Sequence, residues 1–396
     1  MHRRAETSIL IAGGGIGGLC AALALARKGF ASMVFERASG EAQAGAGIQL
    51  GPNATRLLAA WGLGHALGAC AAFPDGIALY DGISGKALAR IPLGATALSR
   101  YGAPYALLHR ADLHGLLIEA ARAEPLISIV AGCAALECEE SDEGVRLNTS
   151  HGVYAGAALV AADGLRSTIR PAVAEGARPE PSGLIAWRAL IPAAAFPALA
   201  GDAEIGLWMR PGMHLVHYRV SGGALLNLVL VAPAGDGEPE RAGQAHGGAH
   251  RPDVAPWPGR LRAALAAVPE WTPWPLWELA PLARWSRGRI ALLGDAAHAV
   301  QPFMASGSVL AIEDAAVLAH EVATTAEDLA AAFARYEKAR LARAERVRRA
   351  SLQAGRIYHL SGAMRLARNA VLRTSPPLLL LRRNDWLYGF RAIPGI

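Results

Sequence analysis

The chain has 396 residues, of which 53% are hydrophobic, and it can bury a large core in two intertwined domains followed by C-terminal helices. Its formal net charge is +6, but the basic residues are scattered or, between residues 335 and 349, interspersed with Glu337 and Glu345. A solvated helix face has this mixture of charges, so we expect no nucleic-acid partner.

The first predicted element is a short apolar strand at residues 8–12, which runs into a glycine-rich turn and an alanine-rich helix. The turn has the G-x-G-x-x-G pattern of a dinucleotide-binding βαβ unit, at Gly13, Gly15 and Gly18. Gly13 permits the tight turn, Gly15 lets a pyrophosphate approach the backbone, and Gly18 lets the helix pack closely on the strand. The N–H groups and the dipole at the helix N-terminus favour phosphate binding.

The second predicted strand, at residues 33–37, ends in Glu36 and Arg37. Glu36 is placed to accept hydrogen bonds from the ribose of an adenosine. NAD and FAD present the same adenosine diphosphate to such a turn, so this pattern does not distinguish between them.

Three later segments point to the same ligand. Residues 45–54 hold three glycines and a proline, which fit a loop passing close to a flat ligand. Arg110 opens a predicted helix, where it contacts a cofactor phosphate or forms a salt bridge with Asp112. Asp163 and Gly164 then end a predicted strand.

The middle of the chain predicts an antiparallel sheet. Residues 182–232 contain alternating stretches, and the turn at residues 221–223 predicts a hairpin. On one of these strands His214 and Tyr218 share a face, while His217 points to the other face.

The segment that follows is rich in turn residues and tryptophan. Residues 233–258 contain many Gly and Pro residues and predict a mobile loop. The tryptophans after it indicate either an aromatic binding platform or packing in a core or interface, and they are Trp271, Trp274, Trp277 and Trp285.

The last motif begins with Gly294 and Asp295, and His298 follows closely. Pro302 then leads into a predicted helix that starts near Gly307. This motif lies far along the chain from the first glycine turn, so two distant segments are expected to build one cofactor site.

Three motifs together carry a resemblance that covers nearly the whole chain. They are Gly13-x-Gly15-x-x-Gly18, Asp163-Gly164 and Gly294-Asp295. Their order and spacing resemble the three signatures of the group A flavoprotein monooxygenases. Within that group the chain is most similar to the salicylate hydroxylase and 6-hydroxynicotinate 3-monooxygenase type.

The resemblance implies an α/β fold with a Rossmann-like FAD-binding domain, an inserted antiparallel-sheet substrate domain and C-terminal helices. The FAD-binding domain is expected at residues 1–72, 97–180 and 284–350, the substrate domain at 73–96 and 181–283, and the helical region at 351–396.

It also implies which residues bind FAD non-covalently. They are Gly13, Gly15, Gly18, Glu36, Arg37, Gly47, Arg110, Asp163, Asp295, Pro302, Gly307 and Ser308. Asp295 is expected to hydrogen-bond the ribitol, and the helix start near Gly307 to face the flavin pyrimidine edge, where it stabilises the negative charge of reduced flavin. Most relatives carry Gln where this chain has Ser306. His298 is expected to support the motif rather than to act as an acid or base.

The chemistry of the group follows from its cofactor. NADH or NADPH reduces FAD, O2 adds at flavin C4a, and the resulting hydroperoxide attacks an electron-rich carbon of a phenolic or N-heteroaromatic substrate. The protein supplies orientation and a dry cavity. The family has no separate nicotinamide-binding domain, so the choice between NADH and NADPH stays open.

The catalytic candidates are His214, Tyr218 and Gln49, which together with Phe303 are expected to line the substrate pocket. Tyr218 is expected to donate to a substrate oxygen, and His214 to accept a proton or pair with a carboxylate. The alternative is that both are ordinary sheet residues with satisfied hydrogen bonds.

Two positions depart from the 6-hydroxynicotinate enzyme, which has histidines where this chain has Gln49 and Phe303. Burying a carboxylate without cationic or donor partners is costly. We therefore predict that a less anionic or bulkier aromatic binds better, and that 6-hydroxynicotinate is not the preferred substrate.

Two other functions stay open, a ubiquinone-pathway-type hydroxylase acting on a prenylated phenol and an FAD-binding protein without hydroxylase turnover. Nothing in the first residues predicts a signal peptide, and residues 378–381 form a leucine run too short to span a bilayer. This run is expected to pack in the core rather than against a membrane or a second subunit.

The cysteines have neither metal nor disulfide spacing, and they are Cys20, Cys70, Cys133 and Cys138. We expect a cytoplasmic monomer or homodimer without a metal site.

Overall fold

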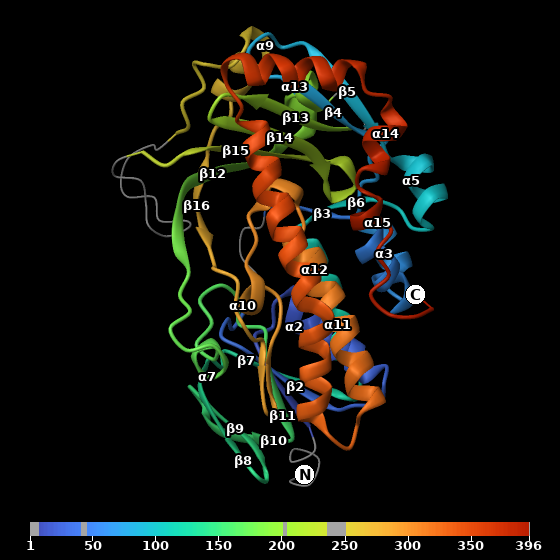
Figure 1. The fold of residues 1–396 in the computed structure, drawn as a ribbon, viewed down its shortest axis with the longest axis vertical. Coiled ribbons are helices and arrows are strands. Elements are labelled where there is room, and N and C mark those ends of the chain that lie inside the picture. The colour runs from blue at the N-terminus through green and yellow to red at the C-terminus, as the bar shows by residue number, and fades with distance from the viewer. Residues whose placement is uncertain (1–7, 41–45, 201–203, 236–250, 396) are drawn as a thin grey trace.

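The computed structural model describes residues 8–40, 46–200, 204–235 and 251–395. The first residue of the loop expected at 45–54, and most of the loop expected at 233–258, lie outside these ranges. The molecule is elongated, with one sheet toward each end and a long helix running between them (Figure 1).

The lower sheet in Figure 1, called here the parallel sheet, has six strands in the order β17-β18-β11-β1-β2-β7. Their bounds, in the same order, are Ser286–Arg287, Ile290–Leu292, Ala158–Ala161, Ile9–Ala12, Ser32–Glu36 and Ile127–Ala131. Neighbouring strands are parallel except β17 and β18. Strands β1 and β11 are buried along their whole length, as expected for parallel strands covered on both faces.

Helices connect the strands of this sheet and cover its faces. Helix α2 (Ile16–Ala26) connects β1 to β2, and its small side chains let α11 (Gly307–Thr324) pack directly on it. Helix α6 (Arg110–Ala123) also packs on α2, and α12 (Leu329–Tyr358) lies along α11. This βαβ arrangement confirms the predicted α/β fold.

The upper sheet, called here the roof sheet, has seven strands in the order β16-β12-β15-β14-β13-β4-β5. Their bounds, in the same order, are Thr272–Glu278, Glu180–Pro192, Leu225–Pro233, Met213–Val220, Glu204–Arg210, Gly76–Asp81 and Ala87–Pro92. Strands β14 and β15 form the predicted hairpin around η2 (Ser221–Gly223). The sheet is antiparallel except that β4 and β13 pair in parallel, since β4 joins the sheet from a distant part of the chain.

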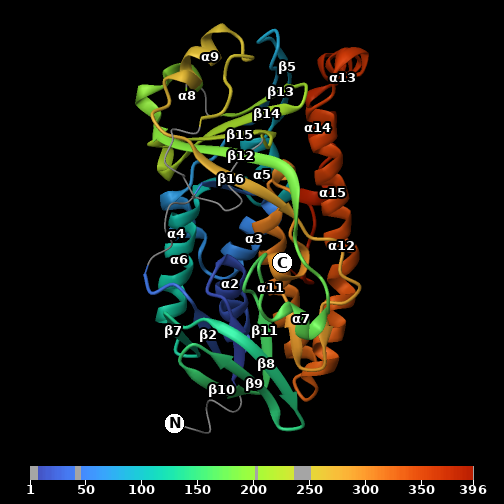
Figure 2. The same ribbon diagram turned by 90° about the vertical axis from the view of Figure 1, so that its left-hand side faces the viewer.

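The two faces of the roof sheet have different surroundings. One face carries Trp187, Leu215 and Leu230, which pack with Leu261 and Leu265 in a core of their own. Helices α8 (Pro197–Ala200) and α9 (Gly259–Ala266) lie on this side, away from the parallel sheet (Figure 2). The opposite face of the roof sheet, called here the inner face, therefore lies on the side of the parallel sheet.

Smaller elements complete the fold. The short strands are β3 (Gly47–Leu50) paired with β6 (Ala106–His109), and the three-stranded sheet β8 (Ala135–Ser141), β9 (Gly144–Thr149) and β10 (Gly152–Gly156). The remaining helices are α3 (Pro52–Ala60), α4 (Gly64–Cys70), α5 (Gly94–Tyr101), α7 (Arg170–Val173), α10 (Asp295–His298), η1 (Ala193–Ala195), η3 (Pro302–Met304), α13 (Gly362–Thr374), α14 (Pro377–Arg382) and α15 (Asp385–Tyr388).

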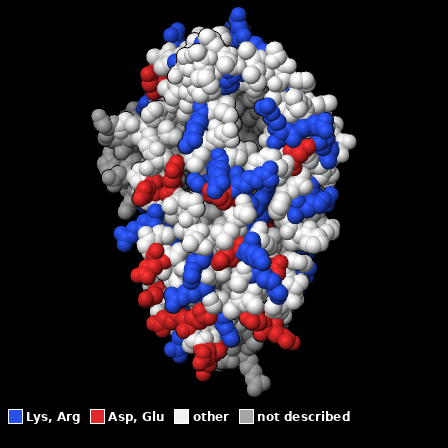
Figure 3. Space-filling view, viewed as in Figure 1, with Lys and Arg blue, Asp and Glu red and all other residues white. Residues whose placement is uncertain are grey.

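The C-terminal part is helical, and α12 continues without a break through residue 350, where the sequence analysis ends the FAD-binding domain. The leucine run in α14 divides between two environments, because Leu380 and Leu381 are buried while Leu378 and Leu379 are exposed. No helix in the described part of the chain is long and apolar enough to cross a membrane. Basic and acidic side chains are interspersed on the face that carries α12 (Figure 3).

Candidate functional site

Three glycines shape the turn between β1 and α2. Gly13 has φ +102°, and a Cβ there would lie 2.4 Å from the carbonyl oxygen of Ala162. A Cβ on Gly18 would lie 1.9 Å from the carbonyl oxygen of Gly13, so helix and strand approach too closely for any side chain. Among the described residues beyond its own helix and chain neighbours, no atom lies within 4 Å of a Cβ placed on Gly15, which borders a pocket instead.

Side chains from two other elements hold this turn. Glu36, at the end of β2, accepts hydrogen bonds from the N–H groups of Gly14 at 2.7 Å and Ala38 at 2.9 Å. His114 Nε2 on α6 lies 2.8 Å from the carbonyl oxygen of Gly14. The turn is therefore fixed before any ligand arrives.

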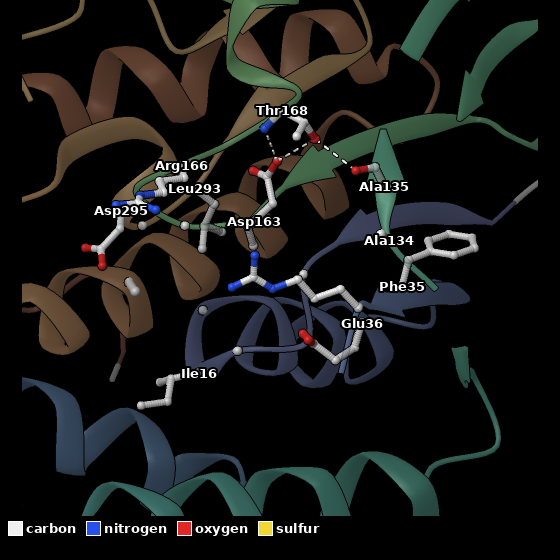
Figure 4. Close-up of a pocket in the computed structure, with 18 of the residues that line it drawn as sticks. Ile16, Phe35, Glu36, Ala134, Ala135, Asp163, Arg166, Thr168, Leu293 and Asp295 are labelled. Carbon is white, nitrogen blue, oxygen red and sulfur yellow. Dashed lines mark hydrogen bonds between the residues drawn. The ribbon is translucent and has the colours of Figure 1, made fainter. Parts of the chain in front are cut away.

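A pocket opens beside the turn, between the parallel sheet and the N-terminus of α11 (Figure 4). It brings together these predicted cofactor residues: Gly13, Gly15, Glu36, Arg37, Arg110, Asp163, Asp295, Gly307 and Ser308. In Figure 4 Arg166 and Asp295 lie together at one end of the pocket, away from Glu36 and Phe35. Of the other predicted residues, Gly18 packs behind the turn, Gly47 lies under the roof sheet and Pro302 opens η3.

The charges of the pocket fit FAD. Helix α2 has no acidic residue in its first turn and no side-chain cap, so its first N–H groups remain available to phosphates. Arg37 and Arg110 add positive charge at the same pocket. Asp163 accepts from the N–H of Thr168 through one carboxylate oxygen, while its other oxygen is buried, has no partner among the described residues and suits a ligand donor.

The two readings of Arg110 can now be compared. Asp112 accepts a 2.9 Å hydrogen bond from the Ser221 hydroxyl and lies 3.8 Å from His109 Nδ1. Arg110 lies at the pocket. This placement favours the phosphate contact over a salt bridge with Asp112.

The segment before α11 makes a tight bend at the other end of the pocket. Ala305 has φ +49°, in the left-handed region that non-glycine residues seldom adopt. The Ser306 hydroxyl donates to the carbonyl oxygen of Met304 at 2.8 Å, which stabilises the bend. Gly307 and Ser308 then open α11 at the pocket, so the positive end of the helix dipole faces it.

A buried ionic cluster lies behind this motif. Arg340 on α12 donates to Asp314 at 2.7 Å and to Glu313 at 2.8 Å, and all three side chains are fully buried. Arg343 adds a 2.9 Å bond to Glu313. Burial alone would raise the pKa of both carboxyls, but the neighbouring charges outweigh it and hold each pKa below its usual value.

His298 belongs to this cluster. Its Nε2 hydrogen-bonds Asp314, and its ring lies 4.9 Å from that of Trp285. Burial would lower the pKa of His298, but the charge of Asp314 raises it. These contacts support the motif role that the sequence analysis assigned to His298.

Under the roof sheet, Tyr218 and Gln49 are linked to a third polar residue. Tyr105 donates to Gln49 Oε1 at 2.7 Å, and Gln49 also hydrogen-bonds Tyr218. Because the amide oxygen faces Tyr105, the amide N–H groups face Tyr218. The Tyr218 oxygen accepts this bond, so its own O–H can donate elsewhere. Burial raises the pKa of Tyr218, and the Gln49 bond offsets part of that effect.

Asn227 stands directly opposite Tyr218 in the roof sheet. Its Oδ1 accepts a 2.7 Å hydrogen bond from the N–H of Gly47, while its Nδ2 is buried and finds no partner in the part of the chain that the structure describes. A Cβ on Gly47 would overlap both Asn227 and Tyr218, so glycine lets β3 approach the roof sheet. Sequence reasoning missed Asn227, whose signal is one amide in an otherwise apolar strand.

His214 lies on the same face, nearer the end of α12. Its ring is 5.5 Å from Phe303 and 5.4 Å from Tyr358, and its Nδ1 is 2.9 Å from His359 Nε2. Tyr358 and His359 are far away in sequence, so no local pattern connects them with β14. His217, on the opposite face, accepts from Trp208 Nε1 at 3.0 Å, which confirms the predicted alternation.

Arg188 on β12 is a further polar residue of this face that sequence reasoning did not select. It shares a cross-strand row with Val229 and Val216, and its guanidinium lies 4.5 Å from the ring centre of Trp274. Its Nε is buried, and no described residue accepts a hydrogen bond from it. Burial lowers its pKa to about 10, so the side chain stays cationic at neutral pH.

The tryptophans do not form one platform. Trp271 packs in the core of the roof sheet, Trp274 lies under Arg188, Trp277 lies 5.4 Å from Arg166, and Trp285 contacts His298. In the described ranges, no group of three His, Cys, Asp or Glu residues could hold a metal ion. All four cysteines are free.

Comparison with known proteins shows the family of the chain. A protein-family model described as an FAD binding domain matches residues 6–351. A 3-hydroxybenzoate 6-hydroxylase of Polaromonas naphthalenivorans is 35% identical, covering 98% of this chain and 97% of its own. A 6-hydroxynicotinate 3-monooxygenase of Bordetella bronchiseptica is 36% identical, covering 87% and 90%. The structure of Klebsiella pneumoniae HpxO complexed with FAD and uric acid matches with a TM-score of 0.84 and 26% identity, covering 97% of each chain.

Proposed function

Because the chain belongs to the FAD binding domain family and is an FAD-dependent aromatic monooxygenase, we propose that its substrate binds between the roof sheet and the flavin. The substrate is a phenolic or N-heteroaromatic small molecule, NADH or NADPH is the reductant, and O2 is the oxidant. The observation that carries the proposal is the polar face formed by His214, Tyr218 and Asn227, which lies above β3.

The residues of this face have distinct roles in the proposal. Tyr218 receives a hydrogen bond from Gln49 and directs its own O–H toward a substrate oxygen. His214 is neutral, because burial and its neighbour His359 lower its pKa to about 3, so it can accept a proton from a substrate hydroxyl. Phe303 packs beside His214 and gives an aromatic ring an apolar contact. FAD, when bound, supplies the oxygen-transfer chemistry.

The substrate specificity is also part of the proposal. Gln49 and Phe303 are neutral, which supports the prediction that 6-hydroxynicotinate is not the preferred substrate. Arg188 adds a cation to the same face and offers a charge partner to an acidic substituent, so the cost of burying a carboxylate is reduced there and the specificity proposal rests on the two replaced histidines. The proposed substrate site thus combines an apolar contact from Phe303 with the cation of Arg188.

A substrate panel tests the proposal. The purified protein is expected to be yellow, and an aromatic compound is expected to accelerate its NADH or NADPH oxidation and to yield hydroxylated product. The panel contains 3-hydroxybenzoate, its neutral amide and 6-hydroxynicotinate, and peroxide is measured separately. If 6-hydroxynicotinate gives the highest kcat/KM with hydroxylated product, the specificity proposal is wrong.

The other functions give different results in the same assay. A ubiquinone-pathway-type enzyme would act on a prenylated phenol in lipid vesicles and leave the water-soluble panel unchanged. An FAD-binding protein without turnover would be yellow, yet no compound would stimulate oxidation. A cytoplasmic location and a monomeric or homodimeric state complete the proposal, and gel filtration with light scattering tests the latter.

A further inference from the structure

The imidazoles of His214 and His359 form a pair that leads away from the proposed substrate pocket. His214 Nδ1 and His359 Nε2 are 2.9 Å apart. His214 is 3% exposed, whereas His359 is half-buried at the C-terminal end of α12. One ring donates and the other accepts, so the tautomer of each ring depends on the other.

Neutral groups surround the pair. The rings of Phe303 and Tyr358 contact His214, and the Tyr358 hydroxyl donates to the carbonyl oxygen of Phe303 at 3.2 Å. Burial, together with His359, lowers the pKa of His214, and burial lowers that of His359. Both rings are therefore neutral near pH 7.

Charged groups in the neighbourhood have other partners. Asp81 lies on the same cross-strand row as His214 and pairs with Arg365 of α13 at 2.8 Å. Arg368 donates to backbone carbonyl oxygens just before His359, at 2.9 Å. Within the described residues, no Asp or Glu forms an ion pair with either histidine. This arrangement differs from that of His298, which Asp314 holds in one place.

We propose that His214 and His359 form a relay that carries the hydroxyl proton of the substrate out of the pocket. His214 is the group that touches the substrate, and His359 acts through it. The relay rests on the proposed hydroxylase function, because it needs a phenolic substrate beneath β14.

The relay moves one proton into solvent. The substrate O–H gives its proton to His214 Nε2, and the Nδ1 proton of His214 passes to His359 Nε2. The Nδ1 proton of His359 leaves to water. The substrate becomes a phenolate, while both imidazoles stay neutral with exchanged tautomers. The reverse passage returns a proton to the product oxygen and restores the first tautomers.

A second histidine solves a physical problem at His214. A buried imidazolium without a neighbouring carboxylate is costly in free energy. His214 alone therefore does not stay protonated after it accepts the substrate proton. Transfer to His359 avoids a lasting charge at the buried position. The phenolate that remains is the more electron-rich form, which favours attack on its ring.

The test uses the FAD-loaded enzyme and the best substrate of the panel. His359→Gln keeps a side chain that can hydrogen-bond His214 but removes the imidazole. Stopped-flow absorbance follows ionisation of the bound substrate from pH 6 to 9, about the range around neutrality in which histidine relays operate. We expect ionisation to slow on the order of a hundredfold, as for loss of a general base, while FAD content stays the same. His65→Gln on α4 is the control, because His65 is exposed.

A second variant separates a relay from a structural role. His359→Ala leaves space beside His214, and added imidazole is expected to restore ionisation in proportion to its unprotonated fraction. If His359→Gln ionises the substrate at the wild-type rate with an unchanged pH profile, the relay is overturned. It is also overturned if both variants are slow and imidazole restores neither. If no panel compound is hydroxylated by the wild-type enzyme, the proposed function fails instead.

Discussion

At the scale of single residues, the glycines of the first turn do different work. Gly13 and Gly18 are required by the protein itself, because a Cβ on either would overlap a carbonyl oxygen. Gly15 has open space beside it and ordinary extended backbone, with φ −73° and ψ −176°. Its glycine is needed only if a ligand approaches there.

This difference gives a prediction for Gly15→Ala. The methyl group fits the protein alone but enters the space expected for the FAD pyrophosphate. An overpacked contact costs about 1–3 kcal/mol, so FAD affinity is expected to fall on the order of tenfold or more. Fluorescence titration of the apoprotein measures this, and thermal unfolding of the apoprotein should not change. Gly115→Ala, with open space on α6, is the control. Equal FAD affinities in all three proteins would contradict the role of Gly15.

Local sequence patterns reached only part of the site. The turn at Gly13 and the face shared by His214 and Tyr218 follow from short-range periodicity, which dihedral geometry dictates. The sequence analysis did not select Asn227 or His359 as site residues. Their partners, Gly47 and His214, lie far away in the chain. Such contacts depend on how whole elements pack, and a single sequence does not encode that packing in a local pattern.

At the scale of elements, the contact between α11 and α12 depends on buried charge. Glu313 and Asp314 of α11 meet Arg340 and Arg343 of α12 without contact with water. Asp314 also accepts from the N–H of Gly294 at 3.2 Å. The cluster therefore fixes the last sequence motif to the long helix.

Removing one member of the cluster should be costly. Arg340→Met leaves two buried carboxylates without their shared partner, and the expected loss in free energy of unfolding is about 3–5 kcal/mol. Chemical denaturation measures this loss. Arg335→Met on the same helix is the control, since Arg335 is half-exposed and its pair with Glu321 is worth about 0–1 kcal/mol. Similar losses in both variants would count against the cluster.

The sign of the pH effect follows from the carboxyl groups. The folded protein lowers the pKa of Glu313 and Asp314, so their stabilising contribution is full above their usual values. This stabilising contribution is lost as the pH falls through the lowered pKa values of the two carboxyls in the folded protein. The gap in stability between wild type and Arg340→Met is therefore expected to narrow in acid.

Element order was easier to predict than element pairing. The hairpin of β14 and β15 follows from alternation and its turn residues, and the structure confirms it. In the parallel pair of β4 and β13, the two strands lie far apart in the chain, and no sequence pattern between them indicates that they pair. The sequence analysis predicts an antiparallel sheet from residues 182–232, and it does not predict that β4 adds to this sheet in parallel.

At the scale of the whole molecule, the outer face of the roof sheet has a hydrophobic core of its own, separate from the core around the parallel sheet. Leu265 of α9 belongs to the core on the outer face of the roof sheet, and Leu318 of α11 belongs to the core around the parallel sheet. Both side chains are fully buried. A defect in one core need not reach the other.

Leu265→Ala and Leu318→Ala form a matched pair for this separation. Each deletion is expected to cost about 2–5 kcal/mol. Leu265→Ala should weaken aromatic substrate binding and leave FAD affinity unchanged, whereas Leu318→Ala should weaken FAD binding. Titrations with FAD and with substrate, made below the unfolding temperature of each variant, measure both. Equal effects on FAD affinity would show that the cores act as one.

The outer core of the roof sheet has a consequence for how this enzyme can diversify. Strands β12, β14 and β15 pack on their outer face against α8 and α9, so part of the packing that holds the sheet lies away from the substrate side. A substitution at an inner-face position outside the catalytic residues and the packed core, such as that of Arg188, can then change the substrate while the outer core is kept. New substrates become accessible by small steps, each of which leaves a working flavoprotein for selection to act upon.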